Sequence, residues 1–303
     1  MSKKRTLVAC WVAVSTVGVA CSAERAPDRA EQGAVEAASR SSGSVPAEER
    51  LYGVTVDDVS GISAITDSLA RLAHKPTTRI VFDERVPATQ YVSAAAAIHR
   101  VSHVMGEILD SYYVKDYTTE EYASRTREYL ATLGDQVDIW EIGNEINGEW
   151  VGDGPTVRTK MKSAYDIVKG KGKTAALTLY YNEGCWERDD HEMFHWASAN
   201  VPADMKQGLD YVLISYYEDD CENQRPDWQP IFDQLGQMFP SSKIGFGEVG
   251  TKVARKKASY LTRYYTMPIE HPRYIGGHFW WYFRQDMVPY TKPLFTTLNE
   301  AIR

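Results

Sequence analysis

The most constraining feature of the sequence is a regular alternation of short apolar runs with amphipathic segments, which begins at Leu51 and continues to the C-terminus. Turn residues bound each apolar run, as expected for buried strands, and the segments between them have the apolar spacing of helices. Successive runs lie about 25–35 residues apart, which is typical of strand–helix units. The predicted strands are Leu51–Val56, Arg79–Phe82, Val104–Leu109, Asp138–Gly143, Thr174–Tyr180, Tyr211–Ser215, Ile244–Gly247 and His278–Phe283.

Eight such units in about 250 residues predict an α/β fold, a (β/α)8 barrel formed as a single domain by residues 51–303. A doubly wound open sheet is the alternative, but no glycine-rich phosphate loop follows the first predicted strand. In a barrel, functional side chains gather where the strands end and the next loops begin. Helices are expected between the strands, for example at Val59–Leu72, Thr119–Leu133, Thr156–Lys169 and Lys256–Tyr265.

Residues 1–20 have the features of a lipoprotein-type signal peptide. A basic start, Lys3 to Arg5, precedes an uncharged apolar run over residues 6–20, which is too short to span a bilayer comfortably. Small residues before Cys21 resemble a bacterial lipobox, in which the cysteine is lipidated and becomes the mature N-terminus. We therefore expect export to the cell envelope, with a lipid anchor at the outer membrane or cell surface. A plainly cleaved signal, giving a secreted protein, and a retained membrane anchor are the alternatives.

Residues 21–50 are predicted to be a disordered tether, because they hold almost no large apolar side chain that could offset the entropy lost on ordering. The chain has four cysteines, and two of them, Cys10 and Cys21, lie before the predicted domain. In an oxidising compartment the remaining pair, Cys185 and Cys221, is a disulfide candidate. Two separate buried thiols are the other interpretation.

The charge balance excludes one large class of function. Lys and Arg number 34 against 41 Asp and Glu, for a formal net charge of −7. A protein that neutralises nucleic-acid phosphates normally has the opposite balance, so we expect no nucleic-acid partner. Aromatic residues make up 12% of the chain, with 8 Trp and 19 Tyr. Such rings fill a core or face a ligand, and sugar-binding clefts are one place where they collect.

Two predicted strand ends carry glutamate in distinctive settings. The fourth strand leads into Asn144-Glu145, with Glu141 three residues before the asparagine, and the seventh ends in Gly247-Glu248-Val249-Gly250. Cleavage of a glycosidic bond needs one carboxyl group to protonate the leaving oxygen and another to attack or to activate water. A barrel can present two such groups from different strands at one mouth.

At these residues the chain resembles the clan A glycoside hydrolases, including glycoside hydrolase family 5 and the endo-β-1,4-galactanases. The resemblance implies a glycosidase that acts with retention of configuration, in which Glu145 is the acid/base and Glu248 the nucleophile. Their carboxyl groups should then lie roughly 5–5.5 Å apart. The relatives often have proline after the strand-four glutamate, where this chain has Ile146, and family 5 has histidine at the position of Ser215. These departures leave the family and the sugar open.

The resemblance implies roles for further residues at the substrate site. Arg79 matches the arginine that lies near the nucleophile, and Asn144 matches the asparagine that precedes the acid/base. Tyr217 fits the tyrosine that hydrogen-bonds the nucleophile, with Tyr216 as the register alternative. Trp280 fits the tryptophan that forms the floor of the sugar site, again with an uncertainty of one residue.

Other side chains are candidates from their positions alone. Trp150, Trp186 and Trp228 lie on predicted loops at the same rim and could stack on sugar rings. Asp110 ends the third strand and is a candidate for binding sugar hydroxyl groups, whereas Glu141 is expected to pair with Arg79 inside the barrel.

The function predicted from these features is hydrolysis of a β-linked poly- or oligosaccharide by a monomer that needs no metal or other cofactor and contacts the membrane only through its lipid anchor. A barrel that binds glycan without cleaving it is the first alternative. The second is a zinc hydrolase, because residues 191–195 match the pattern H-E-x-x-H, which on a helix places two imidazoles on one face.

Overall fold

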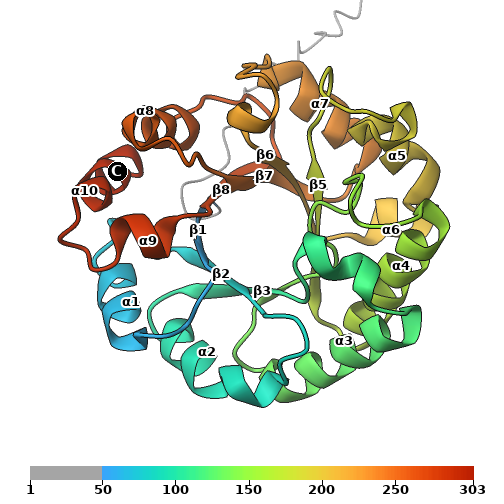
Figure 1. Ribbon diagram of the computed structural model, residues 1–303, viewed down its shortest axis with the longest axis horizontal. Coiled ribbons are helices and arrows are strands. Elements are labelled where there is room, and N and C mark those ends of the chain that lie inside the picture. The colour runs from blue at the N-terminus through green and yellow to red at the C-terminus, as the bar shows by residue number, and fades with distance from the viewer. Residues whose placement is uncertain (1–49) are drawn as a thin grey trace, which may run out of the picture. The chain divides into compact units, whose positions relative to one another are not determined.

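The computed structural model describes residues 50–303, so Cys21, the predicted signal peptide and nearly all of the predicted tether lie outside the described residues. Parallel strands close into a barrel in chain order, with β8 hydrogen-bonded to β1, and helices surround them (Figure 1). The predicted (β/α)8 barrel is confirmed. The strands are β1 Leu51–Val56, β2 Thr77–Val81, β3 His103–Glu107, β4 Ile139–Glu141, β5 Thr174–Tyr180, β6 Tyr211–Tyr216, β7 Lys243–Val249 and β8 Tyr274–Trp280.

The helices follow from local sequence signals. Thr118 and Glu121 form a capping box, each side chain accepting the backbone N–H of the other, so α3 begins at the predicted residue. Asp153 caps α4, and Pro155 lies in its first turn, where a missing N–H does no harm. The helices are α1 Ile62–Leu69, α2 Val92–His99, α3 Thr119–Leu133, α4 Gly154–Gly170, α5 Met193–Asn200, α6 Ala203–Gly208, α7 Trp228–Met238, α8 Ala254–Tyr265, α9 Phe283–Met287 and α10 Pro293–Ala301, with short 3-10 turns η2 Ala88–Tyr91, η3 Ser111–Asp116, η4 Asp189–His191 and η5 Glu218–Asp220.

The barrel interior is built in two chemically different layers. One layer is apolar and consists of Met105, Ile139, Ala176, Leu213, Ile275 and Phe279. Side chains on a strand alternate in direction, so residues two further along also point inward. On β3 to β6 these residues are polar, namely Glu107, Glu141, Thr178 and Ser215, and all are buried. A polar layer therefore lies above an apolar one, at the end of the barrel where the strands stop.

The last strand lies earlier in the chain than predicted, at Tyr274–Trp280 rather than His278–Phe283. Gly276 and Gly277 have φ values of 82° and 91°, and a Cβ on Gly277 would clash with the carbonyl oxygen of Phe246 on β7. The glycine pair therefore permits close contact between β7 and β8, although in the sequence it looks like a turn. Within residues 50–303, no helix combines the length and apolar character needed to cross a membrane.

Candidate active site

Arg79 is the centre of the polar layer. The side chain enters the barrel from β2 and is fully buried, and its three nitrogens each approach a different carboxylate. Nε lies 2.6 Å from Glu141 Oε2, Nη1 lies 2.6 Å from Glu248 Oε1, and Nη2 lies 3.0 Å from Glu107 Oε2. Burial by itself lowers the pKa of Arg79, but the three acidic neighbours outweigh it and raise that pKa well above its usual value. The arginine is therefore a permanent cation.

Glu248 is held by fixed donors on both carboxylate oxygens. Arg79 donates to Oε1, and the hydroxyl group of Tyr217 donates to Oε2 at 2.7 Å. The backbone N–H of Glu248 donates to Ser215 Oγ at 2.9 Å, so neighbouring strands fix the main chain as well. Charge-assisted hydrogen bonds of this kind hold a carboxylate more firmly than neutral ones. Glu248 is therefore a well-oriented carboxylate beside a cation.

Glu145 has the opposite environment. It follows β4 in a turn with φ of 44°, an uncommon conformation for a residue with a side chain, and it is 8% exposed. Its Oε2 lies 3.4 Å from Ser111 Oγ, and its Oε1 has no hydrogen-bond partner in the part of the chain that the structure describes. Burial, followed by the charges of Glu248 and Asp110, raises the pKa of Glu145 well above its ordinary value. Burial and the neighbouring acidic groups therefore favour the protonated form of this carboxyl group.

Glu145 and Glu248 line the same cleft, which has a volume of about 520 Å³ and lies at the carboxyl ends of the strands. Asn144 also lines it, and the side-chain oxygen of this buried residue has no hydrogen-bond partner within residues 50–303. The cleft therefore presents one carboxyl group with a raised pKa, a second carboxyl group oriented by Arg79 and Tyr217, and an amide oxygen without a partner among the described residues.

The structure decides the two register alternatives. Tyr217 lies in the cleft against Glu248, whereas Tyr216 points outward, where it is 1% exposed and donates to the carbonyl oxygen of Gln224. The prediction of Tyr216 as a substrate contact is wrong, because alternate strand residues face opposite sides.

The same alternation corrects the tryptophan prediction. Trp280 is fully buried outside the barrel, and its indole N–H donates to Asp286 of α9 at 3.0 Å. Trp281 lines the cleft instead, and its ring lies 5.9 Å from the guanidinium carbon of Arg79. The tryptophan that β8 and its following loop place in the cleft is therefore Trp281.

Two of the three candidate loop tryptophans lie at the cleft. Trp150 packs edge-on against Tyr180 and donates to Ser111 Oγ at 3.0 Å, and Trp186 lines the cleft half-buried. Trp228 instead begins α7 and is buried against Tyr181 and other rings, so it cannot reach a ligand.

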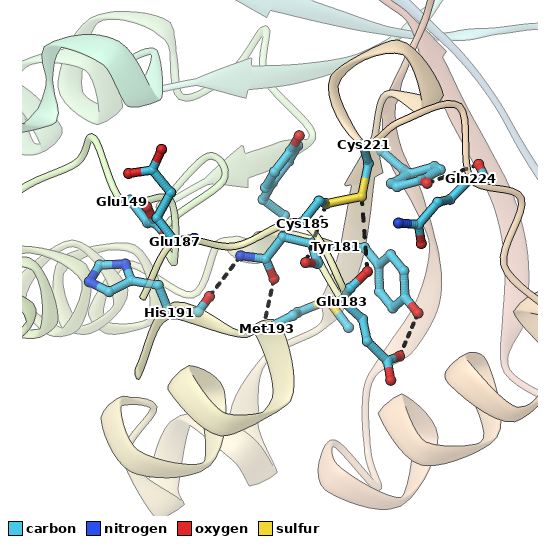
Figure 2. Close-up of a disulfide and its surroundings, with 12 residues drawn as sticks. Glu149, Tyr181, Glu183, Cys185, Glu187, His191, Met193, Cys221 and Gln224 are labelled. Carbon is cyan, nitrogen blue, oxygen red and sulfur yellow. Dashed lines mark hydrogen bonds between the residues drawn. A yellow bond between two sulfur atoms is a disulfide. The ribbon is translucent and has the colours of Figure 1, made fainter. Parts of the chain in front are cut away.

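The predicted disulfide is confirmed, and it connects two loops at the cleft (Figure 2). Cys185, in the loop after β5, is bonded to Cys221, which follows η5 in the loop after β6, with their Cα atoms 5.4 Å apart. Glu149, after β4, accepts the backbone N–H groups of Glu187 and Arg188 at 2.8 and 2.9 Å. The disulfide and the Glu149 hydrogen bonds therefore link three consecutive loops. In the sequence, Trp186 lies between Cys185 and Glu187, the residues that these interactions hold.

The H-E-x-x-H segment does not form the helix face that a zinc site of this type requires. His191 belongs to η4 and is buried, and its Nδ1 lies 2.9 Å from the carbonyl oxygen of Asn147. Glu192 is the N-cap of α5, and its two oxygens accept backbone N–H groups of that helix. The two histidines therefore lie on different elements, and Glu192 has a structural role.

Sequence reasoning missed Glu107 and Tyr180. Glu107 lies two residues after Met105 on β3, so strict alternation from the apolar layer would have indicated an inward-facing carboxyl group. Tyr180 is the last residue of β5 and lines the cleft, a position that the barrel architecture itself marks as functional. Asp110, which the sequence did mark, lines the cleft, and burial raises its pKa.

No protein-family model matches the sequence, and no curated protein is similar enough to count as a relative. Solved structures do share the fold. Saccharomyces cerevisiae Gas2p in complex with laminaripentaose matches with a TM-score of 0.55 at 12% identity, over 84% of this chain and 64% of that chain. A GH18 chitinase from Pseudoalteromonas aurantia matches with a TM-score of 0.54 at 11% identity, over 83% of this chain and 99% of that chain.

A β-glycosidase, BGL167, matches with a TM-score of 0.50 at 12% identity, over 77% of this chain and 86% of that chain. This chain spans less than two thirds of the length of the Gas2p chain, 64%. At these identities the likeness shows the fold alone. The fold that these structures share with this chain is the (β/α)8 barrel.

Proposed function

We propose that the protein is a retaining glycoside hydrolase that cleaves a β-linked poly- or oligosaccharide by double displacement. The observation that carries the proposal is the contrast between two carboxyl groups in one cleft. Both are buried, but Glu248 accepts hydrogen bonds from Arg79 and Tyr217, whereas Glu145 lacks a donor on Oε1 within residues 50–303 and has a raised pKa. Acid and nucleophile in a glycosidase need such a difference.

In the first step of this mechanism, Glu248 attacks the anomeric carbon while Glu145 donates its proton to the leaving glycosidic oxygen. A covalent glycosyl ester on Glu248 and an ionised Glu145 result. In the second step Glu145 takes a proton from water, whose oxygen displaces Glu248 and releases the sugar with its original configuration. Arg79 and Tyr217 keep the carboxylate of Glu248 oriented before attack and accept it again as leaving group.

The charge of the cleft supports a neutral glycan as substrate. Among the described residues that line it, six are acidic, Asp110, Glu145, Glu149, Glu187, Asp220 and Glu248, and none is Lys or Arg. Uronate or sulfate groups would be repelled there, because like charges close together in a partly desolvated cleft are unfavourable. Aromatic faces at Trp150, Trp186 and Trp281 suit the apolar faces of sugar rings.

The test is a screen on plant, fungal and bacterial glycans with sizing of the products, in which E248Q and E145Q serve as matched inactive controls. The proposal predicts hydrolysis of a neutral β-glycan by the wild-type protein only. Binding without turnover after long incubation would instead favour the glycan-binding alternative, and equal turnover by E248Q would refute the assigned nucleophile.

We also propose that the enzyme is an exported monomer attached to the cell envelope through lipid on Cys21, which lies outside the described residues. The basic start and the apolar run before this cysteine support the proposal. Acyl mass on the mature peptide that begins with Cys21 would bear it out, whereas a mature N-terminus beyond Cys21 would refute it.

A further inference from the structure

The hydrogen-bond donors in the polar layer of the barrel are too few for all of its carboxyl oxygens. Glu141 accepts from Arg79 Nε and from the hydroxyl group of Thr178, and Glu248 accepts from Arg79 Nη1 and from Tyr217. Glu107 lies 3.0 Å from Arg79 Nη2, but neither of its oxygens accepts a well-directed hydrogen bond within residues 50–303. Of these three carboxyl groups, Glu107 therefore accepts the fewest well-directed hydrogen bonds.

The charges around Glu107 are also unbalanced. One guanidinium group faces three carboxyl groups, Glu107, Glu141 and Glu248, all almost entirely removed from water. If all three were ionised, the cluster would carry two uncompensated negative charges, and such charges in a protein interior are strongly unfavourable. Binding of one proton to the cluster reduces this excess from two negative charges to one.

Within residues 50–303, the elements that surround Glu107 supply it with no cation besides Arg79. Arg125 of α3 uses its nitrogens on the carbonyl oxygens of Ile108, Val86, Phe82 and Asp83. Tyr122, also on α3, donates its hydroxyl hydrogen to the carbonyl oxygen of Ile142. Asp110, three residues beyond the end of β3, adds negative charge. The proton that the cluster requires therefore belongs on the one carboxyl group without a directed donor.

We propose that Glu107 is a neutral carboxylic acid in the folded protein at neutral pH and acts as a positioning residue for Arg79. In this form Glu107 contacts the guanidinium group but does not compete with Glu248 for its positive charge. Consistent with this, burial raises the pKa of Glu107 well above its ordinary value; Arg79 opposes the shift, and the neighbouring acidic groups add to it. With Glu107 neutral, the positive charge of Arg79 is shared by Glu141 and Glu248 only. The nucleophile then keeps its cation.

Carbon-13 NMR of protein labelled at the glutamate side-chain carboxyl carbon tests the protonation directly and without any substrate. Wild-type protein at pH 7 should show two protonated glutamate carboxyl signals, those of Glu107 and Glu145. The E145Q variant should keep one signal, and E145Q/E107Q should show none. A single signal in the wild type that disappears in E145Q would overturn the proposal, and this outcome does not require E107Q to fold.

The kinetic arm rests on the proposed glycosidase activity and uses Glu141 as the matched control. Gln has nearly the shape of a protonated Glu, so E107Q should keep kcat within about threefold of wild type at pH 7. E141Q, which alters the acceptor of the Arg79 Nε hydrogen bond, should lose about tenfold or more. Equal large losses in both variants would contradict the neutral state of Glu107, because Gln would then fail to replace it. If no glycan is cleaved at all, the NMR result still decides the protonation of Glu107.

Discussion

The Cys185–Cys221 disulfide is expected to contribute substantially to stability, and the size of the effect follows from the loop it closes. The two cysteines are 36 residues apart in the sequence. Loop-closure entropy of the unfolded chain then gives up to about 4 kcal/mol at 25 °C. An unfolding entropy of about 2.1 cal/mol/K per residue over residues 50–303 converts this into a decrease in Tm of about 7 °C when the bond is removed.

The assay is thermal unfolding of the wild-type protein and of the C185A/C221A variant, each with and without a reducing phosphine. Reduced wild type and the variant should unfold at similar temperatures, and the reductant should leave the variant unchanged. A decrease in Tm below about 1 °C, or an equal effect of reductant on the variant, would refute the reasoning, because the lost cross-link would then contribute almost nothing.

The same bond should affect substrate binding more than turnover. In the sequence Trp186 lies between Cys185 and the two residues whose backbone N–H groups bind Glu149, so loss of the disulfide frees one side of this loop. We expect KM for a glycan to rise while kcat stays near its wild-type value, because Glu145 and Glu248 lie on other loops and strands. The matched control is W186A, which should raise KM without changing Tm by more than about 2 °C.

Three further outcomes follow from the site. E248Q should lower kcat by at least about 10³-fold with an unchanged far-ultraviolet circular dichroism spectrum, and a smaller loss would remove Glu248 from the mechanism. Y217F removes one donor from the carboxylate of Glu248 and should lower kcat about 10- to 100-fold. Y216F loses only a hydrogen bond to the backbone of Gln224 and should retain full kcat. Equal kinetic losses in the two variants would contradict the assignment of Tyr217, and not Tyr216, to the cleft. Because the folded-state pKa of Glu145 is raised, its stabilising effect is complete below pH 4.5 and is lost as the pH rises towards and through the folded-state pKa. E145Q should therefore gain Tm relative to wild type between pH 5 and pH 8, and a difference that does not change with pH would show that this carboxyl group is not protonated in the fold.

The barrel and the two central glutamates could be predicted from the sequence because each depends on local signals. Apolar runs and turn residues recur along the chain, and α3 begins at the predicted residue because its capping box is local. Asn144-Glu145 and Gly247-Glu248 each fall at a strand end, where the fold exposes side chains to one mouth. These features required no knowledge of how distant strands pack.

Features that depend on strand register were harder to predict. A shift of one residue moves a side chain to the other face of a strand. The glycine pair at 276–277 looks like a turn, so the start of β8 could not be recognised, and the sequence could not distinguish Trp281 from Trp280. The role of Glu107 depends on three strands meeting at Arg79, and no local pattern contains that information. The disulfide and the Glu149 hydrogen bonds on either side of Trp186 likewise join separate loops.

The most direct measurement of the central mechanism is mass spectrometry of the protein after reaction with activated 2-deoxy-2-fluoro glycosides of the glucose, galactose, mannose and xylose series. In such reagents the first displacement proceeds but the second is slow, so the sugar stays on the attacking residue. We predict one added fluoroglycosyl mass on the peptide that contains Glu248, and no adduct in E248Q. Sugar attached to a different carboxyl group, or inversion at the anomeric carbon in products of the normal reaction, would contradict the mechanism.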